Sequence, residues 1–139
     1  MPSLTYVLSL SQSTAVCELA ANALQAITPH AITIISGPKV AMVQLRVSEG
    51  VADTVFNAGE VLVTETRLEV NGQFGFGMII GNQPEFATAL AVIDAVMRIP
   101  GPHHTLINTR VAELANVLQQ HQHRQFAASN STKVEFDIF

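Results

Sequence analysis

Histidine and carboxylate side chains are the residues of this 139-residue chain that could bind a metal ion or carry protons. Four of the five histidines lie in two pairs, His103-His104 and His121-x-His123. Adjacent side chains point apart in regular structure, and side chains at i and i+2 of a helix diverge by about 200°, so neither spacing favours joint ligation of a metal. A metal site would need a third ligand that the spacing does not supply. We therefore expect exposed histidines, no metal site and no cofactor of the chain's own.

Three polar residues are candidates for binding a ligand or organising a turn. Glu60 follows a glycine at a strand entrance, where its carboxylate could bind a cation or organise a turn at Asn57, and turn organisation is the favoured interpretation. Asp94 precedes Arg98 by four residues, which suits an ion pair on a helix and favours a structural role over a catalytic one. No Ser-His-Asp or Cys-His set has the spacing of a catalytic site, so no residue is predicted to be catalytic.

The glycines of Gly75-x-Gly77-x-x-x-Gly81 invite a nucleotide interpretation, because a loop and a helix that could hold an anion at its amino end follow them. Their spacing matches neither the Walker A motif nor the dinucleotide fingerprint, and the first two lie inside a predicted strand. Turn and packing glycines are the favoured interpretation. The alternative is a small-molecule enzyme or binder acting alone, with Glu60, Arg67 and Asp94 around a pocket and the Gln83 loop holding a phosphate.

The elements that position these residues centre on 56–98, which is predicted to form strand, turn, strand, loop and helix. Asn71-Gly72 separates two β-rich runs and supplies the positive φ angles of a two-residue type I′ hairpin. In that hairpin Val70 faces Gln73, and Leu68 and Thr66 pair with Gly75 and Gly77. Strand glycines indicate close approach of another element, here the helix that follows. Because that helix is apolar around its whole circumference from 86 to 97, we expect it to be buried on more than one side.

The other face of the hairpin is predicted to contact a partner. It alternates three charged residues with three large apolar ones, which makes it too apolar for bare solvent and too charged for an ordinary core. These residues are Glu65, Arg67, Glu69, Phe74, Phe76 and Met78.

Outside this unit the sequence predicts a helix at 3–10 and a second one, capped by Ser11 or Ser13, that runs to about residue 27. Two strands follow at 31–36 and 39–47, separated by the turn signal Gly37-Pro38. A long helix is predicted from 105 to 122 and a linker from 127 to 131. Residues 133–139 alternate apolar and polar side chains, so we expect a terminal strand that adds to a sheet, either its own or a partner's. The fold class is α+β: an antiparallel sheet of four to five strands with packed helices, plus a long C-terminal helix and the terminal strand. One domain spans 1–139, with 100–139 as a possible C-terminal extension or arm.

Composition restricts the class of partner. With 48% hydrophobic and 13% charged residues, the chain carries fewer charges than the quarter or so of a typical soluble domain. No apolar run approaches the roughly 18 residues of a membrane span, so the excess points to protein partners rather than to a membrane. The net charge of −4 without a basic stripe argues against nucleic acid. The single Cys17 excludes an intrachain disulfide and suits a buried structural thiol. The amino terminus lacks a signal-peptide pattern, so a cytoplasmic location is expected.

Four segments follow one another in a characteristic order and spacing: Phe56-Asn57-Ala58-Gly59-Glu60 before Val63-Thr64, the hairpin entering Gly75-Phe76-Gly77 and Gly81, Ala91-Val92-Ile93-Asp94-Ala95, and Ser131-Thr132-Lys133-Val134-Glu135-Phe136. Together they resemble the G subunits of the carbon-phosphorus lyase core complex, the PhnG family of phosphonate breakdown. Two positions depart from the family pattern, Gln83 where Asp is expected and Thr88 where many members have Glu.

The resemblance implies a subunit of the transferase assembly that forms α-D-ribose 1-methylphosphonate 5-triphosphate from ATP and methylphosphonate. It also implies the H, I and J subunits as partners, with the glycosyl transfer assigned to the I subunit and no catalytic residue to carry over to G. We therefore expect a structural, non-catalytic role, with self-association of the isolated chain as a further interpretation. The predicted partner interface comprises Glu65, Arg67, Phe74, Phe76, Met78, Val134, Phe136 and Ile138.

Overall fold

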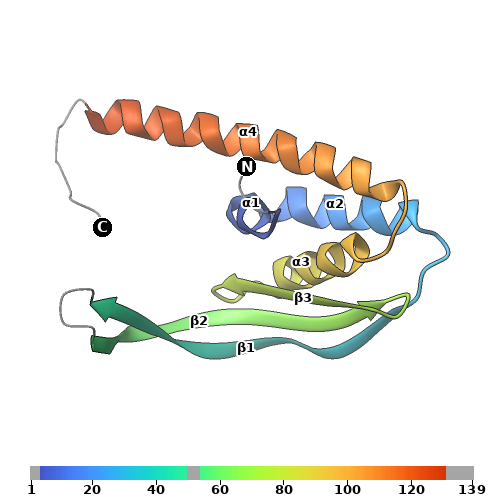
Figure 1. The fold of residues 1–139 in the computed structure, drawn as a ribbon, viewed down its shortest axis with the longest axis horizontal. Coiled ribbons are helices and arrows are strands. Elements are labelled where there is room, and N and C mark those ends of the chain that lie inside the picture. The colour runs from blue at the N-terminus through green and yellow to red at the C-terminus, as the bar shows by residue number, and fades with distance from the viewer. Residues whose placement is uncertain (1–3, 50–53, 131–139) are drawn as a thin grey trace.

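The computed structural model describes residues 4–49 and 54–130, which form an α+β fold of four helices and three strands. The elements are α1 (Leu4–Leu10), α2 (Ser13–Ala26), β1 (Ile32–Glu49), β2 (Thr54–Val70), β3 (Gln73–Ile80), α3 (Pro84–Met97) and α4 (His103–Asn130). The sheet forms one layer, α3 lies on it, α1 and α2 lie on α3, and α4 is the layer furthest from the sheet (Figure 1). None of the described helices is both long and apolar enough to cross a lipid bilayer.

The sheet is antiparallel in the order β1-β2-β3, so the described part of the chain has three strands where four to five were predicted. The predicted strands at 31–36 and 39–47 are one strand, because Ile34 pairs with Leu68 and Lys39 pairs with Glu65 of the same β2. Two register shifts absorb the extra residues around Gly37-Pro38, as in a β-bulge, so this dipeptide bends β1 without ending it. The strand predicted at 133–139 lies outside the described residues.

The predicted β-hairpin is confirmed. Asn71 and Gly72 have φ angles of 50° and 83°, and the ladder pairs Val70 with Gln73, Leu68 with Gly75 and Thr66 with Gly77. The Asn71 side chain also accepts a 2.8 Å hydrogen bond from the N–H of Ala31, while its own N–H donates to the Ala31 carbonyl. The turn is therefore fixed to the start of β1 as well as to its own strands.

The strand glycines permit the close packing of α3 on the sheet. A Cβ atom at Gly75 would overlap the carbonyl oxygen of Ala91, and one at Gly77 would overlap that of Ala87. On its other side α3 meets α2, whose buried residues include Val16, Leu19 and Ala23. The prediction that this helix is buried on more than one side is confirmed, and nine of its residues belong to the core.

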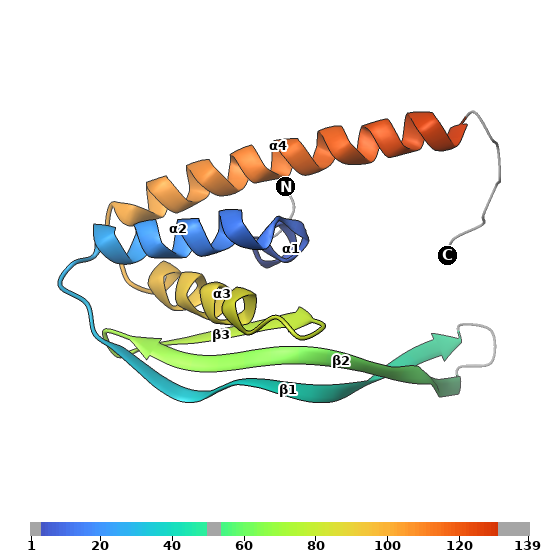
Figure 2. The ribbon, with the colours of Figure 1, turned by 180° about the vertical axis from the view of Figure 1, so that it is seen from behind.

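Helix α4 continues to Asn130, so the predicted end at 122 and the predicted linker at 127–131 are wrong as far as the described residues extend. No glycine or proline interrupts 103–130, and the polar stretch consists largely of Gln, Arg, Ala and other residues that tolerate a helix. Ile107, Val111 and Leu114 of the predicted apolar seam are buried, and the helix packs on α1 and α2. With 28 residues it is about 42 Å long and extends beyond α1 and α2 (Figure 2).

Candidate functional site

The sheet face that points away from α3 carries the predicted partner-binding residues of the hairpin. Cross-strand pairing sets Glu65 beside Met78 and Arg67 beside Phe76. Directly paired residues point to the same face, which here is opposite the face of the buried Thr64, Thr66 and Leu68. The prediction that the hairpin has one face against the helix and one charged, apolar face is confirmed.

Charges on this face are held in a fixed arrangement. The Glu65 carboxylate lies 3.1 Å from the Arg67 guanidinium and 3.6 Å from the Lys39 ammonium on the neighbouring strand. The guanidinium of Arg67 lies over the ring of Phe76, 5.0 Å from its centroid, in a cation–π arrangement. Because Glu65 is paired with two cations, its carboxylate can be desolvated with its charge compensated, whereas Glu69, which pairs with Phe74 on the same face, has no ion pair with the described residues.

Large apolar side chains on the same face remain exposed. Phe74 is 38% exposed, Met78 is 44% exposed and Ile80, which pairs with Val63, is 69% exposed. Sequence reasoning missed Lys39 and Ile80, because each joins this face only through pairing with β2. We call this surface the open sheet face: Lys39, Glu65, Arg67, Glu69, Phe74, Phe76, Met78 and Ile80.

Asp94 has a structural environment. Its carboxylate accepts a 2.9 Å hydrogen bond from the backbone N–H of Phe76 and lies 3.5 Å from the Arg98 guanidinium, in the predicted i, i+4 pair. A small cavity of about 140 Å³ lies here between Leu4, Leu8, Phe76 and Asp94. The Asp94 carboxylate thus accepts a hydrogen bond from an N–H at the outer edge of β3 and links α3 to that edge.

Glu60, Arg67 and Asp94 do not line one pocket in the described part of the chain. Glu60 is exposed on β2 opposite Gln44, seven residues from Arg67, or about 23 Å along the strand. Arg67 points to the open sheet face, whereas Asp94 lies at the edge of β3. The predicted turn at Asn57 is wrong, because β2 runs through this residue and a register shift there leaves Ala58 unpaired.

The amino end of α3 is held by Thr64, which sequence reasoning did not single out. Its buried hydroxyl donates to the carbonyl of Gly81 at 2.6 Å and accepts from the N–H of Gln83 at 2.9 Å. The Gln83 side chain donates to the carbonyl of Ile80, and Glu85 places a carboxylate in the first turn. An internal hydroxyl and an acidic side chain occupy the region where a phosphate would bind, so the geometry favours the packing role of the glycines.

Two of the four paired histidines close the carboxyl end of α3. His103 Nε2 lies 2.9 Å from the carbonyl of Val96, and His104 Nε2 lies 2.6 Å from that of Ile99. His103 is only 4% exposed, so the prediction that it is an exposed histidine is wrong. The Val96 carbonyl at the end of α3 accepts from the Ile99 N–H at 3.0 Å, and the imidazole is its second partner, which satisfies the polar ring in a buried position. Within residues 4–49 and 54–130 no group of three His, Cys, Asp or Glu side chains is placed to hold a metal ion.

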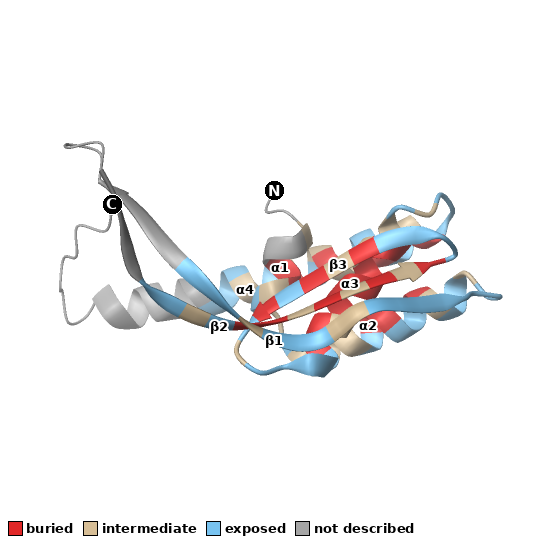
Figure 3. Ribbon diagram, turned by 90° about the horizontal axis from the view of Figure 1, so that it is seen from below, coloured by how far each residue is buried: buried red, intermediate tan, exposed pale blue. Residues whose placement is uncertain are grey.

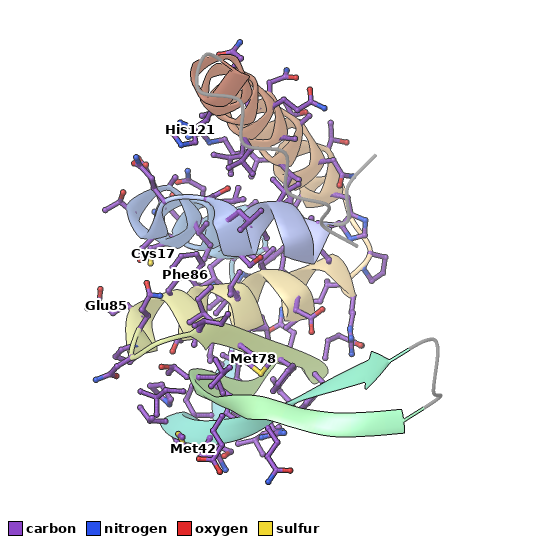
Figure 4. All side chains as sticks on the ribbon, turned by 90° about the vertical axis from the view of Figure 1, so that its left-hand side faces the viewer. Cys17, Met42, Met78, Glu85, Phe86 and His121 are labelled. Carbon is purple, nitrogen blue, oxygen red and sulfur yellow. The ribbon has the colours of Figure 1, made fainter. Side chains whose placement is uncertain are left out.

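Cys17 is half-buried rather than buried and lies between α2 and α3, next to Glu85 and Phe86 (Figure 4). Its Sγ lies 3.8 Å from the carbonyl of Glu85. The thiol lines a mostly apolar cavity of about 460 Å³ with Leu24, Pro38 and Val92. Among the described residues, the only other hydrogen-bond contact of the thiol is the Ser13 hydroxyl at 4.0 Å, which agrees with a structural role.

The family model described as phosphonate metabolism protein PhnG matches residues 3–139. The chain therefore belongs to the PhnG family, and the resemblance inferred from its sequence is confirmed. The chain matches none of the curated proteins with which it was compared. Membership in this family assigns the chain to phosphonate metabolism.

Proposed function

We propose that this member of the PhnG family is a non-catalytic subunit of the carbon-phosphorus lyase core complex and binds its partners through the open sheet face. The complex is the cytoplasmic transferase that forms α-D-ribose 1-methylphosphonate 5-triphosphate from ATP and methylphosphonate. The proposed partners are its H, I and J subunits. The chain supplies a binding surface, and the reacting groups come from other subunits.

The composition of the open sheet face supports this proposal. Aromatic residues, methionine and arginine are enriched in protein–protein interfaces, and all three occur here in Phe74, Met78 and Arg67. Full burial of a Phe, Met or Ile side chain contributes about 1.5–3 kcal/mol, and these side chains are only partly buried in the isolated chain. Covering them with a partner therefore provides a driving force for association.

Electrostatics supports the same surface. Unpaired charges oppose burial in an interface, whereas Glu65 already has Arg67 and Lys39 as partners. These side chains can enter an interface with the Glu65 carboxylate already compensated, and the net charge of +1 that Arg67 and Lys39 leave can set its orientation. Such an arrangement favours recognition of a polar and apolar protein surface.

The two departures from the family pattern agree with a non-catalytic role. Gln83 donates to the carbonyl of Ile80, and the hydroxyl of Thr88 donates to that of Pro84 at 2.8 Å. The hydroxyl of Thr66 then donates to Thr88 at 3.3 Å. Both positions are used in hydrogen bonds that begin α3, and neither carries an acid.

The test is co-expression with the H, I and J subunits, followed by capture through a tag on the I subunit. The double variant Phe74→Asp/Met78→Asp should be retained at least about tenfold less than the parent chain, while its unfolding midpoint stays near that of the parent. The control is Val117→Asp on α4, where the parent residue is 61% exposed and lies on the other side of the molecule. Undiminished capture of the double variant would remove this face from the interface. Turnover of ATP and methylphosphonate by the purified chain would instead support a stand-alone enzyme.

A further inference from the structure

The two edges of the sheet differ in accessibility. At the edge formed by β3, Asp94 occupies the N–H of Phe76, and Leu4 and Leu8 of α1 lie beside the strand. At the edge formed by β1, no other described strand is a neighbour. From Lys39 to Leu45 this strand pairs with β2 without a register shift, and Pro38 before it lacks an N–H. The regular stretch after Pro38 is therefore the place where an additional strand can pair.

Exposed apolar side chains lie along the β1 edge. Val40 is 48% exposed and Met42 is 58% exposed, and both share a face with their partners Thr64 and Leu62, on the side where α3 lies. Helix α3 packs mainly on β2 and β3 and less on β1, whose described residues are mostly exposed (Figure 3). Edge strands of monomeric proteins usually carry charges or prolines that prevent pairing, and the stretch 40–43 carries neither.

The sequence of this chain contains a segment that suits this edge. Residues 133–139, Lys-Val-Glu-Phe-Asp-Ile-Phe, alternate so that Val134, Phe136 and Ile138 share one face of an extended strand. If these three lie beside Val40 and Met42, then Glu135 and Asp137 fall on the opposite face. That face carries Lys39, whose side chain is 53% exposed. The alternation of residues 133–139 therefore sets apolar side chains beside the apolar side chains of β1 and acidic side chains on the face of Lys39.

The length of chain between the end of α4 and Lys133 determines which copy supplies the segment. Helix α4 lies beyond α3 and α2 from the sheet (Figure 1), and each packing distance between layers is about 8–10 Å, so α4 lies more than 20 Å from the sheet. From Asn130 to Lys133 there are three Cα–Cα steps, which span at most about 11 Å. A strand that begins at Lys133 therefore cannot reach the sheet of its own chain.

We propose that residues 133–139 of one copy add as a fourth strand to β1 of a second copy, along residues 39–45. The end of α4 and the end of the β1–β2 pair lie at the same end of the molecule (Figures 1 and 2). A two-fold axis at that end lets each copy give its strand to the other, so one isologous interface satisfies both edges. This inference concerns the chain by itself and does not depend on the proposed role in the lyase complex.

The first test is the mass in solution of the purified chain. The parent should have the mass of two 14.9 kDa chains. Phe136→Asp in the added strand and Met42→Asp on the accepting edge should each weaken dimerisation at least about tenfold, while Val117→Asp should not. A monomeric parent, or a dimer that both variants leave intact, would overturn the proposal. Unfolding midpoints of the isolated chains verify that each variant is folded.

The second test is a disulfide cross-link in a Cys17→Ala background. Chains with Met42→Cys are mixed with chains carrying Phe136→Cys and then oxidised. The proposal expects a heterodimeric cross-link between the two, greatly exceeding that of Val117→Cys chains mixed with Phe136→Cys chains. In the double variant Met42→Cys/Phe136→Cys, a cross-link confined to one chain would overturn the second-copy arrangement.

Discussion

The carboxylate of Asp94 on α3 lies 2.9 Å from the backbone N–H of Phe76 on the edge strand β3 and accepts its hydrogen bond. An N–H at a sheet edge would otherwise need water or another strand as acceptor. One side chain thus fixes the helix to the sheet and closes the edge to further pairing. Its ion pair with Arg98 is the weaker contact, because that arginine is 52% exposed.

Asp94→Ala should lower the free energy of unfolding by about 1–3 kcal/mol, because the N–H of Phe76 loses a charged acceptor. Asp94→Asn keeps a carbonyl oxygen at this position and should cost less than half as much. Arg98→Ala, the control for the ion pair, should cost less than about 1 kcal/mol. Urea unfolding of the three variants measures these differences. Equal losses for Asp94→Asn and Asp94→Ala would show that charge, not hydrogen bonding, sets the contribution.

Gly75→Ala should be severely destabilising, by more than about 3 kcal/mol, because the added methyl group overlaps the Ala91 carbonyl and forces α3 away from the sheet. Gly72→Ala is the control, since the added methyl meets no atom there and the cost is only that of a φ angle of 83° in the turn, about 1 kcal/mol. Thermal unfolding of both variants gives the comparison. A Gly75→Ala variant as stable as Gly72→Ala would mean that the helix can shift without loss.

Thr64→Val should lower stability by about 1–3 kcal/mol, although the two side chains have the same shape. The change removes the acceptor of the Gln83 N–H and the donor to the Gly81 carbonyl, both at the start of α3. Hydrogen exchange of the first-turn amides of α3 should therefore become faster. Thr33→Val at an exposed position of β1 is the matched control and should change neither quantity.

His103→Ala should destabilise the chain by about 2 kcal/mol or more, because it removes a buried ring and one of the two hydrogen bonds of the Val96 carbonyl, which keeps only that from the Ile99 N–H. His30→Ala, at an exposed position, should change the unfolding free energy by less than about 0.5 kcal/mol. Guanidinium unfolding of the two variants measures the difference. Similarly small losses for both variants would contradict a stabilising role of the buried His103 side chain.

The parts of the fold that the sequence predicted depend on local chemistry. Asn71-Gly72 can adopt the positive φ angles of a two-residue hairpin, and the turn then determines the pairing of Leu68 with Gly75. The glycines and the all-round apolar helix that follow indicate close packing without any knowledge of the rest of the chain. For the same reason the open sheet face followed from the alternation of Glu65 and Arg67 with their neighbours.

The parts that the sequence did not predict depend on contacts distant along the chain. Gly37-Pro38 is a local turn signal, yet β2 pairs with β1 on both sides of it and holds the strand together. Thr64 shows its role only when β2 lies beside the start of α3, nineteen residues later in the case of Gln83. His103 is buried because α4 turns back against the end of α3. No periodicity in the sequence carries this information.

Substitution of Arg67 should affect binding to partner subunits more than it affects the stability of the isolated chain. In the isolated chain it is 39% exposed and contacts Glu65 and Phe76, so Arg67→Ala should lower the unfolding free energy by less than about 1.5 kcal/mol. If the open sheet face is buried in the proposed complex, the same change leaves Glu65 with only Lys39 as a partner, at 3.6 Å, in a surface from which water is excluded. Truncating one member of such a desolvated pair costs about 2 kcal/mol or more, so affinity for the partner subunits should fall about thirtyfold or further.

The measurement is the dissociation constant of the chain for the assembled partner subunits, alongside urea unfolding of the isolated chain. Arg110→Ala is the matched control, because Arg110 makes a 2.8 Å ion pair with Glu113 on α4, away from the open sheet face. It removes the same side chain and the same charge, so long-range electrostatics alone would weaken both variants equally. A loss of affinity confined to Arg67→Ala therefore identifies a contact within the interface. Equal losses of affinity in both variants would show that Arg67 acts only through the net charge of the chain.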